Sequence, residues 1–173
     1  TLADQPAPVL VQVEPDSWGF MIWAFGVDGN PDAASVHVQV GGSGFADVAG
    51  FSDDAGGFGR ALLALREQYA PKVRMGWHAS NFRAGTGGDV VASFYGKVGE
   101  WDALVTEHPH VEGDPTQWWL PWDEAKVAQN LAFFSTMTAA ARAPILLWQE
   151  QIGTTDYHLF DADPTMRRRF AQA

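Results

Sequence analysis

Four short apolar segments, each followed at once by polar residues, set the pattern of this chain. In the first, residues 9–13 alternate valine with other residues before the chain turns into Glu14, Pro15 and Asp16. An alternation with a period of two predicts a strand that buries one face. The strands predicted in this way cover residues 9–14, 73–78, 102–107 and 144–149.

The segments between these strands carry helical patterns. Phe58, Leu62 and Leu65 recur at helical spacing, and the acidic pair Asp53 and Asp54 precedes them, as suits a helix N-terminus. Predicted helices cover residues 56–69, 89–99 and 123–142, with Asp89 as a cap of the second. Two segments stay open: residues 18–25 form either a short helix or a wall of a crevice, and residues 36–40 form either an extra strand or a loop.

This alternation of strands and helices predicts the fold class. Repeated βα units indicate an α/β fold with a parallel sheet of about four units, built by residues 1–173 as a single domain. Four units are half of the eight that close a (β/α)8 barrel, which typically takes about 250 residues. We therefore expect either a portion of a larger barrel or a half-barrel that covers its edge strands by forming a homo-oligomer.

Composition argues against several kinds of partner. The net charge of −10, from 11 basic and 21 acidic residues, opposes binding to nucleic acid, where affinity comes from basic side chains. No apolar run approaches the roughly 20 residues of a membrane helix, so we expect no membrane partner. The absence of cysteine removes disulfides and cysteine-based zinc sites. Eight tryptophans are many for this length, and an indole suits sugar rings as well as protein cores.

Polar residues after the strands form the candidate site, because the carboxyl ends of parallel strands meet at one edge of a sheet. Glycoside hydrolysis needs two carboxyl groups flanking the bond, one as acid and the other as base or nucleophile. We expect Asp16 and Glu107 to be this pair, and Glu14 and Glu150 are further candidates. The expected substrate-binding residues are His78, Asn81, Gln149 and the three indoles of one loop, Trp118, Trp119 and Trp122.

A short motif points in the same direction. The sequence VEPD at residues 13–16 resembles the IEPD/LEPD strand end of family 6 glycoside hydrolases, the cellobiohydrolases and endoglucanases, whereas the DRDC-like stretch of that family is absent. The segments ALLALREQYAP, VRMGWHAS and ILLWQEQIG resemble secreted bacterial proteins of glycoside-hydrolase-like barrel type. These resemblances imply a secreted glycoside hydrolase without a cofactor, acting on a polysaccharide such as cellulose or a related β-glucan.

Two other functions are compatible with the same residues. The first is a noncatalytic carbohydrate-binding domain, which would keep the aromatic residues without a competent acid pair. The second is a metal-dependent hydrolase or oxidative enzyme using His78, His108 and His110, because imidazole suits divalent metals.

Some of the candidate residues also have structural interpretations. Glu14 could be the ion-pair partner of Arg74, and Asp16 could cap the turn that follows it. His78 could equally be a hydrogen-bonded histidine of the core.

Overall fold

The computed structural model describes residues 8–13, 15–25, 36–79, 88–107 and 124–148. Four strands form one sheet, β1 (Val9–Val13), β2 (Val73–His78), β3 (Ala103–Glu107) and β4 (Ile145–Trp148). All neighbouring strands run parallel, in the order β1-β2-β3-β4. The predicted α/β class and its parallel sheet are therefore confirmed.

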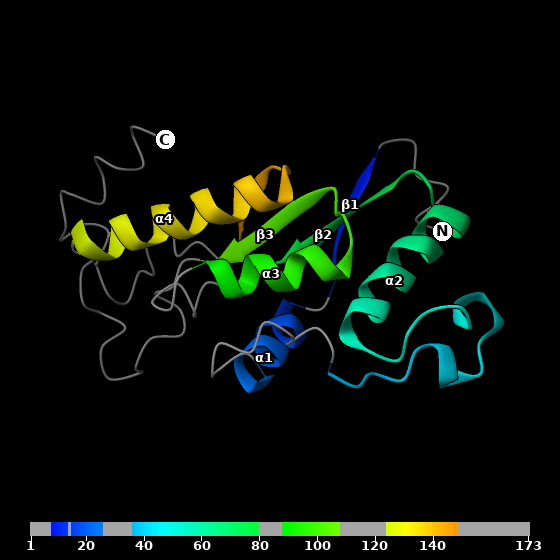
Figure 1. Cartoon of the computed structure of the whole chain (residues 1–173). Coiled ribbons are helices and arrows are strands. Elements are labelled where there is room, and N and C mark those ends of the chain that lie inside the picture. Colours follow the sequence, from blue (N-terminus) through cyan, green and yellow to red (C-terminus); the bar gives the residue numbers. More distant parts are fainter. Residues whose placement is uncertain (1–7, 14, 26–35, 80–87, 108–123, 149–173) are drawn as a thin grey trace, which may run out of the picture.

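Helices connect each strand to the next. The chain passes through α1 (Pro15–Phe25) and α2 (Ala55–Tyr69) between β1 and β2, through α3 (Asp89–Val98) before β3, and through α4 (Glu124–Ala141) before β4 (Figure 1). The segment expected to be either a helix or a crevice wall is thus the helix α1. It begins at Pro15, where proline fits well because the first helical N–H has no partner within the helix. None of the helices in the described segments is both long and apolar enough to cross a bilayer.

The N-cap positions of α2 and α3 differ in their chemistry. Asp54 is the N-cap of α2, and its carboxylate accepts a hydrogen bond from the N–H of Gly57. The predicted cap of α3 is wrong, because Gly88 holds the N-cap position and Asp89 is the first helical residue. At that position Asp89 can still interact favourably with the positive end of the helix dipole.

The segment 36–40 does not form an additional strand. Its β-pairing is a single antiparallel bridge between His37 and Asp54, and the short 3-10 helices η3 (Gly41–Ser43) and η4 (Ala46–Val48) follow. The Asp53 carboxylate accepts hydrogen bonds from the N–H groups of Val40 and Gly42, at 2.7 and 2.9 Å. These bonds to a side chain take the place of a strand partner, so the loop interpretation is the right one.

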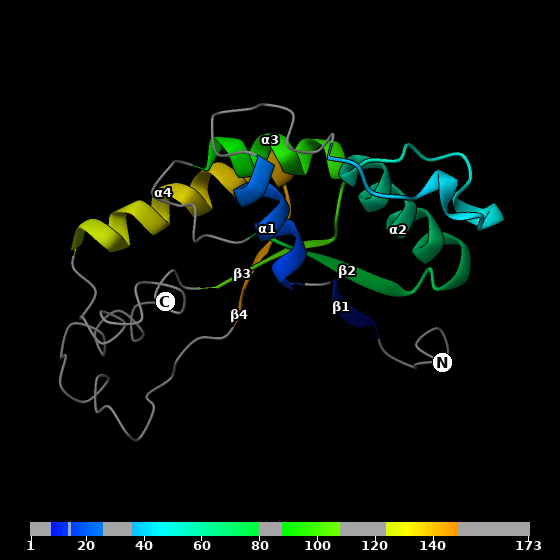
Figure 2. The same ribbon diagram turned by 90° about the horizontal axis from the view of Figure 1, so that it is seen from below.

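The main core lies on one face of the sheet. Side chains from alternate positions of all four strands belong to it, namely Val11, Val13, Val73, Met75, Trp77, Leu104 and Ile145. They pack against residues of α1, α2, α3 and α4, and in Figure 2 these helices lie on the same side of the strands. We call this side the helix face and the other side the open face.

Aromatic side chains fill the centre of that core. Trp18 from α1 lies within about 6 Å, between ring centroids, of Trp77, Phe94 and Trp101, and it also contacts Phe58 of α2. Trp18, Trp77 and Trp101 are buried, so three of the eight tryptophans are core residues rather than sugar-stacking residues. Sequential strand order with every described helix on one face is consistent with half of a (β/α)8 barrel, whereas a doubly wound sheet carries helices on both faces. The half-barrel itself stays a prediction.

Candidate functional site

Three side chains from three strands meet at the carboxyl end of the sheet. His78, the last residue of β2, is only 3% exposed. The side-chain amide nitrogen of Gln12 in β1 lies 2.7 Å from its Nδ1 atom. The indole of Trp148, the last residue of β4, meets the imidazole edge to face, with ring centroids 5.4 Å apart and planes at 86°. We call Gln12, His78 and Trp148 the carboxyl-edge cluster.

Strand register explains how Gln12 reaches His78. Gln12 is paired with Gly76, so Gln12 and His78 are diagonal neighbours on the open face. Such diagonal positions are about 7 to 8 Å apart, a distance that a long side chain spans. Gly76 is required here for packing, because a Cβ atom at this position would lie 2.7 Å from Cγ2 of Val105.

Trp148 reaches the histidine from the other side of β3. It is in register with Glu107, while His78 is in register with Val105, two residues earlier in β3. The indole therefore lies across β3 to meet the imidazole, and the cluster ties β1, β2 and β4 together on the open face. Val105, which lies between them in β3, is 4% exposed.

The hydrogen bond fixes the chemistry of the histidine. The Gln12 amide N–H donates to Nδ1, so in the neutral ring the proton resides on Nε2. An Nδ1 lone pair occupied in this way and a protonated Nε2 suit hydrogen bonding better than metal ligation. Within the described ranges no group of three or more acidic, histidine or cysteine residues could hold a metal ion, and His108 and His110 lie outside those ranges.

The expected acid pair is described at the level of the backbone. Asp16 is the second residue of α1, directly beyond β1, and Glu107 is the last residue of β3. Both backbones therefore lie at the same edge of the sheet as His78, which ends the strand between them. The other predicted site residues lie outside the described residues: Glu14, Asn81, Trp118, Trp119, Trp122, Gln149 and Glu150.

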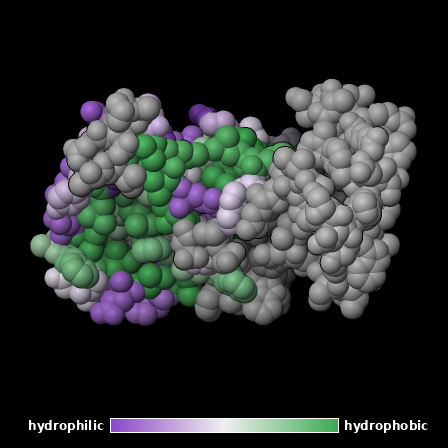
Figure 3. Space-filling model, turned by 180° about the vertical axis from the view of Figure 1, so that it is seen from behind, coloured by the Kyte–Doolittle hydropathy of each residue, from purple (hydrophilic) through white to green (hydrophobic). Residues whose placement is uncertain are grey.

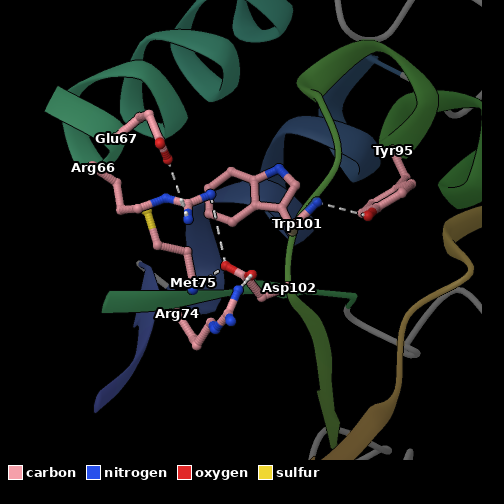
Figure 4. Close-up of polar contacts among 7 residues, drawn as sticks. All are labelled: Arg66, Glu67, Arg74, Met75, Tyr95, Trp101 and Asp102. Atoms are coloured by element: carbon pink, nitrogen blue, oxygen red, sulfur yellow. Dashed lines mark hydrogen bonds and ion pairs between the residues drawn. The ribbon is translucent and has the colours of Figure 1, made fainter. Parts of the chain in front are cut away.

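The other end of the sheet holds a charged network that the sequence did not reveal (Figure 4). The Asp102 carboxylate, just before β3, accepts the N–H of Met75 at 2.9 Å and binds Nη1 of Arg74 at 2.8 Å. Nη2 of Arg66 in α2 lies 3.7 Å from the same carboxylate. Burial acts to raise the pKa of Asp102, but the Met75 N–H and the two arginines outweigh it and hold this pKa below its ordinary value of 3.8.

This network argues against one structural interpretation of Glu14, an ion pair with Arg74, because Arg74 is paired with Asp102. The register opposes that ion pair as well, because Arg74 lies opposite Leu10, whereas Val13, next to Glu14, lies opposite Trp77. Arg74 therefore belongs to the amino edge of the sheet and not to the candidate site.

Sequence reasoning identified His78 and missed its two partners. Gln12 is a polar residue inside an otherwise apolar strand, on the face opposite Val11 and Val13, and that parity was a usable signal. Trp148 lies near the end of the strand predicted at residues 144–149, but its contact with His78 depends on the order of the strands in the sheet, which cannot be read from the sequence.

Comparisons of the chain with models of protein families, with curated proteins and with solved structures found no significant match. The function therefore has to be argued from the residues of this chain.

Proposed function

We propose that this protein is a glycoside hydrolase that acts on a polysaccharide, such as cellulose or a related β-glucan, along the carboxyl edge of its sheet. The observation that carries the proposal is the carboxyl-edge cluster, at the same edge as the backbones of Asp16 and Glu107. A polysaccharide substrate also implies that the protein works outside the cell, as expected of a secreted protein.

The chemistry of the cluster supports a neutral, hydroxyl-rich ligand. The Gln12 amide offers hydrogen-bond donors and an acceptor without a net charge, and the Trp148 indole offers an apolar surface with one N–H donor. Sugar rings present hydroxyl groups at their rims and C–H groups on their faces, so they can use both kinds of contact. The half-buried indole of Trp148 is the described aromatic residue in position for this role.

Strand spacing supports a particular stereochemical outcome. Adjacent strands are about 4.8 Å apart, so the ends of β1 and β3, which flank β2, are about 10 Å apart. Inverting glycosidases hold their two carboxyl groups roughly 6.5 to 9.5 Å apart, and retaining enzymes about 5 to 5.5 Å. If the carboxyl groups of Asp16 and Glu107 keep a spacing close to that of these strand ends, the reaction inverts the configuration, with room for a water molecule between the base and the sugar.

The reaction then needs one proton donor and one base. The acid donates its proton to the glycosidic oxygen as the bond from that oxygen to the anomeric carbon breaks. The base removes a proton from the water molecule whose oxygen bonds to the same carbon. A positioned acid or base contributes typically 10²- to 10⁴-fold to the rate.

The test is a reducing-sugar assay on a panel of polysaccharides, followed by variants. Asp16→Asn and Glu107→Gln should each lower turnover by about 10²- to 10⁴-fold, while Glu67→Gln, at an exposed position of α2, should leave it unchanged. NMR of the first product formed should show the anomer of opposite configuration. Full turnover in both acid variants would refute this assignment of the acid pair.

One observation favours a second candidate, a noncatalytic carbohydrate-binding protein. The members of the carboxyl-edge cluster include an amide, an imidazole and an indole, and none of them is a carboxylate. Affinity electrophoresis in gels that contain the polysaccharide separates the two functions. Retardation that Trp148→Ala abolishes, in a protein without measurable turnover, would establish binding as the function.

A further inference from the structure

The three members of the carboxyl-edge cluster differ in how far they reach the surface. His78 is 3% exposed, whereas Gln12 and Trp148 are both partly exposed. Figure 3 looks onto the open face, on which all three lie, and shows hydrophobic residues over much of the described surface. A ligand that binds this face therefore meets the Gln12 amide and the Trp148 indole and does not reach the imidazole.

The imidazole fixes the position of the Gln12 amide. One N–H of this amide donates to Nδ1 of His78 at 2.7 Å. Among the described residues the Gln12 side chain makes no further hydrogen bond, so its second N–H and its carbonyl oxygen can bind a ligand. A glutamine side chain has many rotamers, and a hydrogen bond that selects one of them in advance spares the ligand part of that entropy cost.

The same imidazole supports the indole of Trp148. The two rings meet edge to face, with centroids 5.4 Å apart and planes at 86°, which is a favourable geometry for aromatic pairs. His78 ends a strand whose backbone pairs with β1 on one side and with β3 on the other. Its ring is therefore a fixed support against which the indole is oriented.

We infer that His78 is a positioning residue of the candidate site, which holds the Gln12 amide and the Trp148 indole in the arrangement that binds a sugar unit and does not touch the sugar itself. The amide then hydrogen-bonds hydroxyl groups while the indole packs against C–H groups. This role differs from the one expected from the sequence, in which His78 itself binds the substrate. The identity of the ligand rests on the proposed function, whereas the arrangement of the three side chains does not.

Two substitutions of His78 separate its two contacts. His78→Phe keeps a ring beside Trp148 and removes the acceptor for Gln12, whereas His78→Asn keeps an acceptor at the δ position and removes the ring. Affinity electrophoresis across a range of polysaccharide concentrations gives the Kd of each folded variant. His78→Phe should raise the Kd by about 10-fold in the parent background and by less than about 2-fold when Gln12→Leu is already present, because it acts through Gln12.

The control for lost stability is Tyr95→Phe. It removes the hydroxyl that accepts the buried backbone N–H of Trp101, away from the cluster, and should leave the Kd unchanged. An effect of His78→Phe that is as large with Gln12→Leu as without it would overturn the inference, because His78 would then contact the ligand directly. Parent-like affinity in both His78 variants would overturn it too, because the contacts of His78 would then support only the fold.

NMR of the ligand-free protein tests the arrangement independently of the glycosidase proposal. The side-chain N–H signals of Gln12 should shift in His78→Phe and stay in His78→Asn, and the indole N–H signal of Trp148 should do the reverse. Signals that stay in place in both variants would overturn the inference. Signals that respond in the expected way, in a protein that binds no polysaccharide, would support the positioning role of His78 and refute the proposed function.

Discussion

Replacing Asp102 tests what holds the amino edge of the sheet together. Asp102→Ala removes the carboxylate that accepts the Met75 N–H and binds two arginines. A hydrogen bond to a charged group contributes about 1.5 to 3 kcal/mol, and loss of the acceptor leaves a partly buried N–H without its partner. Arg74 adds little, because its side chain is 62% exposed and exposed ion pairs contribute at most about 1 kcal/mol.

We therefore expect Asp102→Ala to lower the free energy of unfolding by about 2 to 3 kcal/mol, dominated by the Met75 hydrogen bond. For a chain of this size that corresponds to a decrease in Tm of roughly 4 to 12 °C. Urea denaturation at neutral pH, followed by the fluorescence of the buried tryptophans, measures the change. Glu100→Ala is the matched control, because Glu100 is exposed and two residues away, and its effect should stay within about 0.5 kcal/mol.

The pH dependence of the same variants gives a second readout. The pKa of Asp102 is lower in the folded protein than its ordinary value of 3.8, so its ionisation stabilises the fold above that pH. This contribution is lost as the pH falls through the folded pKa. The stability difference between the parent protein and Asp102→Asn should therefore be largest near neutral pH and shrink below about pH 4. A difference that is independent of pH, or an Asp102→Ala variant as stable as the parent, would refute this account.

Two further predictions concern packing between the helices and a buried hydroxyl. Gly59→Ala should destabilise the fold by about 1 to 3 kcal/mol, because the new Cβ would lie 2.6 Å from the Val98 carbonyl oxygen. Gly96→Ala should instead stabilise α3 by about 0.5 to 1 kcal/mol, because a Cβ at this helical position meets open space. Urea denaturation that gives both changes the same sign would contradict this. Tyr95→Phe should lower the free energy of unfolding by about 1 to 3 kcal/mol in the same assay, because the Tyr95 hydroxyl accepts the buried backbone N–H of Trp101 at 3.0 Å. No measurable loss would mean that this backbone N–H finds another acceptor.

The sequence was informative where one local rule determined the structure. The strand at residues 73–78 was predicted with its observed bounds, because an apolar run between a proline and a polar segment is a strong local signal. The helix α2 was predicted to within one residue, since Asp54 acts as its cap and the apolar residues recur at helical spacing.

The alternation at residues 36–40 was ambiguous for a physical reason. Val36, Val38 and Val40 have the period of a strand, but a strand also needs a partner for its backbone. Asp53, thirteen residues beyond Val40, supplies hydrogen-bond acceptors instead and directs the chain into η3. A window of local sequence does not contain that information.

The candidate site was predictable only in part for a related reason. Parallel strands bring the polar residues that follow them to the carboxyl edge of the sheet. His78 lies at this edge, at the end of β2, as predicted. Its contacts with Gln12 and Trp148 require the strand order and a diagonal register across β2 and β3. Both contacts are tertiary contacts, and Gln12 and His78 are more than 60 residues apart in the sequence.

The amino edge of the sheet controls the geometry of the carboxyl edge through this register. Asp102 donates its backbone N–H to the Met75 carbonyl oxygen and accepts the Met75 N–H with its side chain, so one residue pins β3 against β2 through both polar groups of Met75. With that pair fixed, Val105 must lie opposite His78. A slip of the register by one residue would turn every side chain of β3 to the other face and break the two hydrogen bonds between Asp102 and Met75, leaving polar groups unpaired at a partly buried site. The charged network thus acts at a distance on the candidate site, because it sets which residue of β3 faces His78 and how far Glu107 extends beyond it.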